Sequence, residues 1–232
     1  MQKNHAPIKS SARVYEIDAV RGFALFGILM MNIMIFAGPQ MEDQLTMNTS
    51  EIYSGANSIV VYLINTLVTT NFYTMFSFLF GLGFYIFLSR AEKKQGSIYL
   101  LFIRRMIILL VIGIAHAVFI WYGDILTVYA ITGLLLLFFY RLPPKVNLVI
   151  SIVILFLGTI FVLLLTLLMF SVRDVDISMA STSFYDINME ETVTGSYGDI
   201  ISLNIDMLGV MMTSNIMMLP LILAVFLLGL YA

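Results

Sequence analysis

The sequence predicts an all-α, polytopic transmembrane helix bundle. Of its 232 residues, 60% are hydrophobic and only 11% are charged, and the mean hydropathy is +0.98. Soluble domains contain about 25% charged residues, so this composition excludes an ordinary soluble domain. Six segments are also long and apolar enough to cross a hydrocarbon core, which takes about 17 to 25 helical residues. They lie at 19–38, 72–88, 104–122, 124–140, 146–171 and 214–232.

Residues that interrupt or end helices predict the connections. Region 57–70 is apolar and periodic, but the polar residues at 69–71 interrupt it, so we expect an interfacial helix leading into the second span. The sequence "GD" at 123–124 leaves almost no loop between the third and fourth spans, which predicts a tight antiparallel hairpin. The sequence "LPP" at 142–144 ends the fourth helix, because proline cannot continue it.

The distribution of basic residues predicts the orientation, because Lys and Arg resist translocation across the membrane. Only Arg173 falls on the other side from Lys3, Lys9, Arg13, Arg21, Arg90, Lys93, Lys94, Arg104, Arg105, Arg141 and Lys145. We therefore expect a cytoplasmic tail at 1–17, a transmembrane domain at 18–232 of a multi-pass protein of the cell membrane, and an acidic extracytoplasmic loop at 172–213. The last apolar run, "LPLILAVFLLGLYA", has no basic residue after it, so we interpret the chain as a fragment of a longer bundle.

The first span carries a polar stripe. Asp18, Arg21 and Asn32 lie at three- and four-residue steps with Leu25 and Ile28, so they share one helix face. Charged groups at the centre of a bilayer cost about 2.5 to 3.5 kcal/mol each, which favours a functional role. The alternatives are that Asp18 caps the helix and pairs with a snorkelling Arg21, and that Asn32 only bonds a neighbouring helix.

Other spans bring further polar groups to a similar depth. His116 lies eleven residues past Arg105, about 16 Å at about 1.5 Å per residue, and Asn32 lies equally far past Arg21. Ser77, on a small polar face of the second span, has a similar depth, although such faces most often serve close helix packing. We therefore expect Asn32, Ser77 and His116 to form one polar layer. Asp124 is either the N-cap of the fourth helix or the partner that orients His116.

Four stretches have a distinctive order of residues: "IDAVRGFALFGILMMNI", "YTMFSFLFGLGFYIF", "RRMIILLVIGIAHAVFIWYGDILTVYAITGLLLL" and "FLLGLYA". Together they resemble the YeiB-like family of uncharacterised bacterial membrane proteins. The first stretch is also similar to the start of heparan-alpha-glucosaminide N-acetyltransferases, with Asp18, Arg21, Gly22 and Asn32 matching their Asp, Arg-Gly and Asn. Bacterial polysaccharide acyltransferases have a similar Asp and Arg, with His in place of Asn32. This resemblance implies transfer of an acyl group from cytoplasmic acyl-CoA across the membrane, with Arg21 contacting CoA.

The interpretation that combines residues and resemblance is a possible acyl-CoA-dependent membrane acyltransferase, with acetyl-CoA or another acyl-CoA as donor and an extracytoplasmic acceptor. We expect His116 as base, Asp124 as its orienter and Asn32 as oxyanion donor. The expected substrate-binding residues are Asp18, Arg21, Arg104, Arg105 and Ser77. No metal, permanently bound cofactor or nucleic acid is expected, and the lipid bilayer is the other partner. The alternatives are a small-solute or proton-coupled transporter and a non-catalytic membrane scaffold.

Overall fold

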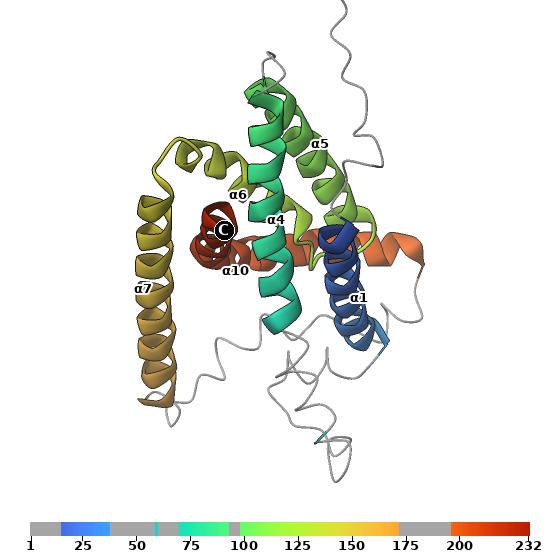
Figure 1. Ribbon diagram of the computed structural model, residues 1–232. Coiled ribbons are helices and arrows are strands. Elements are labelled where there is room, and N and C mark those ends of the chain that lie inside the picture. Colours follow the sequence, from blue (N-terminus) through green and yellow to red (C-terminus); the bar gives the residue numbers. More distant parts are fainter. Residues whose placement is uncertain (1–14, 38–58, 60–69, 93–97, 172–195) are drawn as a thin grey trace, which may run out of the picture.

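The computed structural model describes residues 15–37, 59, 70–92, 98–171 and 196–232, and these fold into helices without a strand, as predicted. The helices are α1 (Tyr15–Ala37), α4 (Thr70–Glu92), α5 (Ile98–Phe119), α6 (Leu126–Phe139), α7 (Pro144–Ser171) and α10 (Tyr197–Tyr231), shown in Figure 1. The interfacial helix expected at 57–70 lies almost entirely outside the described residues and stays a prediction.

Successive helices alternate in direction. Figure 1 shows α4 running opposite to α1, α5 and α7, while α6 returns toward the end where α7 begins. The described Lys and Arg residues consequently gather toward one end of the bundle, which we call the basic end: Arg21, Arg90, Arg104, Arg105, Arg141 and Lys145. The opposite end contains the short connection between α5 and α6 and is called the turn end.

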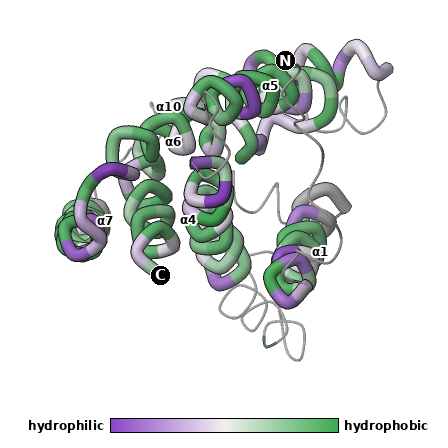
Figure 2. The backbone as a smooth tube through the Cα atoms, turned by 45° about the horizontal axis from the view of Figure 1, so that its top comes forward, coloured by the Kyte–Doolittle hydropathy of each residue, from purple (hydrophilic) through white to green (hydrophobic). Residues whose placement is uncertain are grey.

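Three helices are long and apolar enough to cross a membrane, judged by length and composition: Asn71–Glu92, Tyr99–Phe119 and Pro144–Leu168. They coincide with the spans predicted at 72–88, 104–122 and 146–171. Helix α1 covers the predicted span at 19–38, and two shorter apolar helices, Leu126–Phe139 and Asn215–Tyr231, match those at 124–140 and 214–232. Figure 2 shows hydrophobic residues along all of these helices and hydrophilic positions mostly near their ends. The three long apolar helices indicate a membrane protein.

Helix α10 begins earlier than the sequence suggested. The segment at 172–213 was expected to be an outer loop, but its described part is helical from Tyr197 onward. The Ser196 backbone N–H donates to the Asp199 carboxylate at 2.6 Å, so an acidic residue that suggests a solvated loop instead completes a helix N-terminus. Pro220 lies inside α10, where it removes a backbone hydrogen bond, and Figure 1 shows the helix changing direction along its length.

The C-terminal part of α10 is the centre of the core. Phe226 and Leu227 are fully buried, and Phe226 stacks on Phe80 of α4 with ring centroids 4.5 Å apart. Helices α4 and α10 approach so closely that a Cβ at Gly81 would overlap the Phe226 carbonyl, and one at Gly229 would overlap the Phe78 carbonyl. Small residues at crossings of this kind let helix backbones meet. The small face of the second span therefore serves close packing, which is the interpretation that the sequence favoured.

Candidate functional site

The predicted site residues fall into three places in the bundle. Arg21 and Arg105 line a cavity toward the basic end, which we call the arginine cavity. Asn32 and Ser77 belong to a hydrogen-bonded chain that runs through two tyrosines. His116 contacts Asp124 at the turn end.

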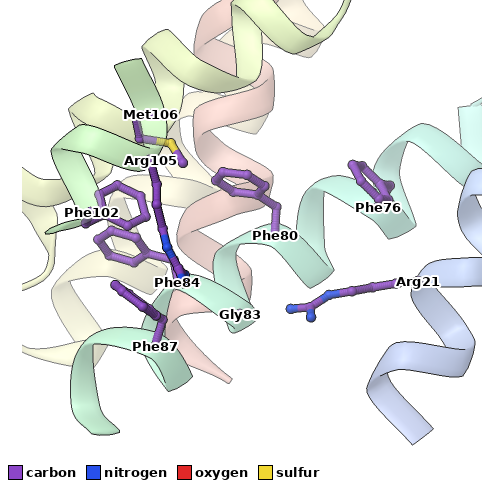
Figure 3. Close-up of a pocket in the computed structure, with 9 residues that line it drawn as sticks. All are labelled: Arg21, Phe76, Phe80, Gly83, Phe84, Phe87, Phe102, Arg105 and Met106. Atoms are coloured by element: carbon purple, nitrogen blue, oxygen red, sulfur yellow. The ribbon is translucent and has the colours of Figure 1, made fainter. Parts of the chain in front are cut away.

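The arginine cavity has a volume of about 250 Å³ and lies along one face of α4, between α1 and α5 (Figure 3). The cavity residues from α4 are spaced three or four apart along the chain and therefore share one helix face: Phe76, Phe80, Gly83, Phe84 and Phe87. Helix α5 adds Phe102, Arg105 and Met106, and α1 adds Arg21. The walls are thus mainly phenyl rings, and among the described residues two guanidinium groups are the only charged groups that line the cavity.

Contacts with α4 hold both guanidinium groups. Arg21 reaches across from α1, and its Nη2 donates to the Leu79 carbonyl at 3.1 Å. It lies against Gly83, where any Cβ would overlap the guanidinium, as Figure 3 illustrates. The Arg105 guanidinium carbon lies 4.3 Å from the centroid of the Phe87 ring, a cation–π contact.

Asp18 and Arg104, which the sequence also predicted to bind substrate, contribute less to the cavity. Asp18 is half-exposed and 3.5 Å from Arg21, and an exposed ion pair of this kind is worth about 0 to 1 kcal/mol. The expected pairing of Asp18 with Arg21 is therefore present but weak. Arg104 is exposed and does not line the cavity, although its neighbour does, because adjacent residues on a helix point in different directions.

The tyrosine chain joins α1, α4 and α6. The Tyr73 hydroxyl donates to Oδ1 of Asn32 at 3.3 Å, and the Tyr129 hydroxyl donates to the Tyr73 carbonyl at 3.5 Å. Ser77 Oγ lies 2.6 Å from the same Tyr129 hydroxyl. Tyr129 is only 1% exposed, so this chain satisfies polar groups inside the bundle. Asn32 and Ser77 are brought together as predicted, and the two tyrosines that join them were not foreseen.

The His116–Asp124 pair lies where α5 ends and α6 begins. His116 Nδ1 is 3.1 Å from Asp124 Oδ1, and the Asp124 side chain is 3% exposed against 31% for His116. These two atoms have no hydrogen bond of good angular geometry within the described residues, so the contact is a close approach of the imidazole to the carboxylate. The other oxygen, Oδ2, accepts the Thr127 N–H at 2.8 Å. Asp124 therefore accepts an N–H of the first turn of α6 and also faces His116. The N-cap of α6 is Ile125, one residue later than predicted, and the orienting role of Asp124 stays a prediction.

Helix α10 fixes this turn from outside. Asn204 is 2% exposed; its Nδ2 donates to the Val118 carbonyl at 3.0 Å and its Oδ1 accepts the Tyr122 N–H at 3.3 Å. Tyr197 donates to the Phe119 carbonyl at 2.6 Å, and Asn215 donates to the Asp124 carbonyl at 3.4 Å. These bonds satisfy backbone groups that a helix end leaves without partners. The sequence did not single out these α10 residues, because they fall in or next to a segment taken for a solvated loop.

The expected single polar layer of Asn32, Ser77 and His116 needs correction. The tyrosine chain links the first two, but no described contact links either to His116, and His116 does not line the arginine cavity. The rise per residue gives the height of a side chain and not the direction in which it points. Among the described residues no group of three His, Asp or Glu side chains could hold a metal ion.

The basic end has its own aromatic and charged residues. Arg141 Nε donates to the Tyr99 hydroxyl at 3.2 Å, and its guanidinium carbon lies 5.3 Å from the Tyr99 ring centroid. The bond to Tyr99 raises the pKa of the Arg141 guanidinium above its ordinary value, so this exposed position stays cationic.

Three uncharacterised bacterial proteins are similar to this chain. A 39.9 kDa protein from the amylase 3′ region of Bacillus acidopullulyticus is 37% identical over 155 residues, which is 67% of this chain and 42% of the relative. YxaH of Bacillus subtilis strain 168 is 36% identical over 62% of this chain and 36% of its own length. YeiB of Escherichia coli K12 is 30% identical over 56% of this chain and 32% of its own length.

The chain is related to YeiB-like proteins. It spans less than half the length of each of these relatives, and none of their names states an activity. No family model matches the chain, and no solved structure matches it significantly. The relatives support the YeiB-like resemblance, whereas the similarity to acyltransferases stays a prediction.

Proposed function

We propose that this chain forms part of a membrane acyltransferase, which takes an acyl group from acyl-CoA at the basic end and delivers it to an acceptor at the turn end. The observation that carries the proposal is the pairing of a partly exposed His116 with a buried Asp124 at 3.1 Å. A buried carboxylate that faces one imidazole nitrogen orients the ring and leaves the other nitrogen to react.

The arginine cavity serves as the donor site in this proposal. CoA carries several negative charges, and guanidinium groups bind phosphate through charge-assisted hydrogen bonds. Arg21 and Arg105 come from different helices and line one cavity, and no carboxylate of the described part of the chain lines it. The eleven residue steps from Phe87 to Phe76 cover about 16 Å along α4. The pantetheine arm would follow this row away from the basic end, with its phosphates left at the arginines.

The chemistry requires one general base. An acceptor hydroxyl or amine gives its proton to Nε2 of His116 while its oxygen or nitrogen bonds to the acyl carbon. The carbon–sulfur bond then breaks, and the CoA thiolate leaves and takes up a proton. Asn32, the expected oxyanion donor, belongs to the tyrosine chain and has no described contact with His116, so the step does not include it. Arg105 and His116 lie about 16 Å apart along α5, so the donor must be long and narrow.

The test is acyl transfer from labelled acyl-CoA by the purified protein in lipid nanodiscs. His116→Ala should lower the transfer rate by about 10²- to 10⁴-fold with acyl-CoA binding retained, the usual contribution of a general base. Arg105→Ala should weaken acyl-CoA binding, whereas Arg104→Ala is the matched control, because Arg104 lies outside the cavity. Transfer at the parental rate by His116→Ala would refute the mechanism.

Two other results would replace the proposal. Uptake of a solute or of protons into vesicles, lost in His116→Ala and without acyl transfer, would favour a transporter that uses the same buried pair. Reduced stability of the His116 and Arg21 variants without any change in acyl-CoA binding would favour a scaffold.

A further inference from the structure

A cluster of aromatic side chains at the basic end adjoins the arginine cavity. Phe84 lines the cavity and packs edge-on against Tyr140, with ring centroids 5.8 Å apart. Tyr85 is 45% exposed and lies 6.5 Å from the same Tyr140 ring. Tyr99 carries the Arg141 guanidinium over its face. We call Tyr85, Tyr99, Tyr140 and Arg141 the tyrosine platform.

We propose that the tyrosine platform binds the adenine nucleotide part of the acyl donor. This inference rests on the proposed function, because it concerns the same donor site. It specifies which donors that site selects: molecules in which an adenine nucleotide is attached to a phosphopantetheine arm. The arginine cavity accepts the arm and its phosphates, and the nucleotide lies outside it on the platform.

The chemistry of the platform fits an adenine ring. Exposed aromatic rings stack on bases regardless of sequence, and each stacked base contributes substantially to affinity. Arg141 is exposed in the connection between α6 and α7, and Lys145 is exposed in the first turn of α7, so cationic groups are available to a ribose phosphate beside the base. Glu92 interacts with Tyr140, and its carboxylate can accept a hydrogen bond from the exocyclic amine of adenine.

Continuity with the cavity is the second argument. A membrane-surface tyrosine that only anchors the bundle needs no fixed relation to a pocket. Here the contact between Phe84 and Tyr140 joins a cavity wall directly to the platform. A nucleotide stacked on Tyr85 or Tyr140 would therefore lie beside the mouth from which the arm enters.

The test is direct binding of adenosine 3′,5′-bisphosphate and of adenosine to the purified protein in nanodiscs, measured by calorimetry. Tyr140→Leu should weaken binding of both probes by about tenfold, and Tyr140→Trp should restore it because stacking needs only an aromatic face. Arg141→Gln should weaken binding of the bisphosphate and leave that of adenosine unchanged. Phe138→Leu is the control, because Phe138 is an aromatic residue that is 77% exposed on the preceding turn.

The outcomes separate this inference from the proposed function. Bisphosphate binding that is unchanged in both Tyr140→Leu and Arg141→Gln, or no saturable binding at all, would show that the tyrosines are membrane anchors only. Acyl transfer that is equally fast from acyl-phosphopantetheine and acyl-CoA would also overturn the platform while leaving the transfer reaction intact. Bisphosphate binding with the expected losses, but no acyl transfer, would retain the platform and overturn the function.

Discussion

Replacing the glycines of α4 and α10 tests the helix crossing at the centre of the bundle. Gly81→Ala places a methyl group on the Phe226 carbonyl, and Gly229→Ala places one on the Phe78 carbonyl. The obstacle is backbone in both cases, so no side chain can rotate away and the two helices must separate. Overpacking of this kind costs about 1 to 3 kcal/mol. The greater helix propensity of alanine offsets about 1 kcal/mol of this cost. We therefore expect a net destabilisation of about 0 to 2 kcal/mol, which is about 1 to 3 kcal/mol relative to the same substitution at a helical glycine with open space around it.

The same chain supplies the matched controls. A Cβ added at Gly22 or Gly209 meets no atom within 4 Å, so Gly22→Ala and Gly209→Ala should be neutral or stabilising by up to about 1 kcal/mol. The free energy of unfolding can be measured by titration with a denaturing detergent, followed by the fluorescence of Trp121, the only tryptophan of the sequence. If Gly81→Ala were as stable as Gly22→Ala, helices α4 and α10 would not cross where described.

Two further substitutions examine the buried polar bonds. Asn204→Leu removes the side chain that bonds two backbone groups of the α5–α6 turn, which should cost about 2 to 4 kcal/mol. It should also shift the fluorescence emission of Trp121, next to Tyr122 in the turn, even in the folded protein. An unshifted spectrum would show that Asn204 does not hold the turn. Ser77→Ala and Tyr129→Phe should each cost about 0.5 to 2 kcal/mol, and a double-mutant cycle should give a coupling near 1 kcal/mol, whereas additive effects would contradict their 2.6 Å contact.

The fold class was predictable because hydropathy averaged over a segment of about 20 residues identifies a membrane-spanning helix, whichever individual residues it contains. The apolar runs at 72–88, 104–122 and 146–171 each form one long helix, and "LPP" at 142–144 separates α6 from α7 as expected. The start of α10 was missed for a local reason. The acidic residues of the outer segment suggested solvated coil, whereas Asp199 satisfies the helix N-terminus and Asn204 faces the turn of the hairpin. Composition alone does not distinguish a solvated polar residue from one that caps or bonds a neighbouring helix.

The sequence predicted individual contacts of the candidate site, but not which side chains from different helices meet in one cavity. Asp124 could be matched to His116 because the two residues lie on either side of a short chain reversal, and Nδ1 of His116 lies 3.1 Å from Oδ1 of Asp124. The connection is nevertheless longer than "GD" predicted: α5 ends at Phe119 and α6 begins at Leu126, so six residues, 120–125, separate the two helices. Arg21 and Arg105 line one cavity, but Arg104, which precedes Arg105 in the sequence, does not. The phenylalanines of α4 that form the cavity walls carry no polar group, so the sequence pattern did not mark them as site residues. Which side chains converge depends on how helices are rotated about their axes, and that is set by packing such as the glycine crossing of α4 on α10.

The crossing and the candidate site depend on each other through α4. Gly81 lets α10 pack closely on one side of this helix, and Gly83, two residues later, leaves space for the Arg21 guanidinium on another side. Phe80 and Phe84 flank these glycines and both line the arginine cavity, and Phe80 also stacks on Phe226 of α10. The sequence "FGLGF" at 80–84 therefore has a physical role in packing. It sets the distance of α4 from α10 and, through the same turn of helix, the position of the cation that α1 contributes to the cavity.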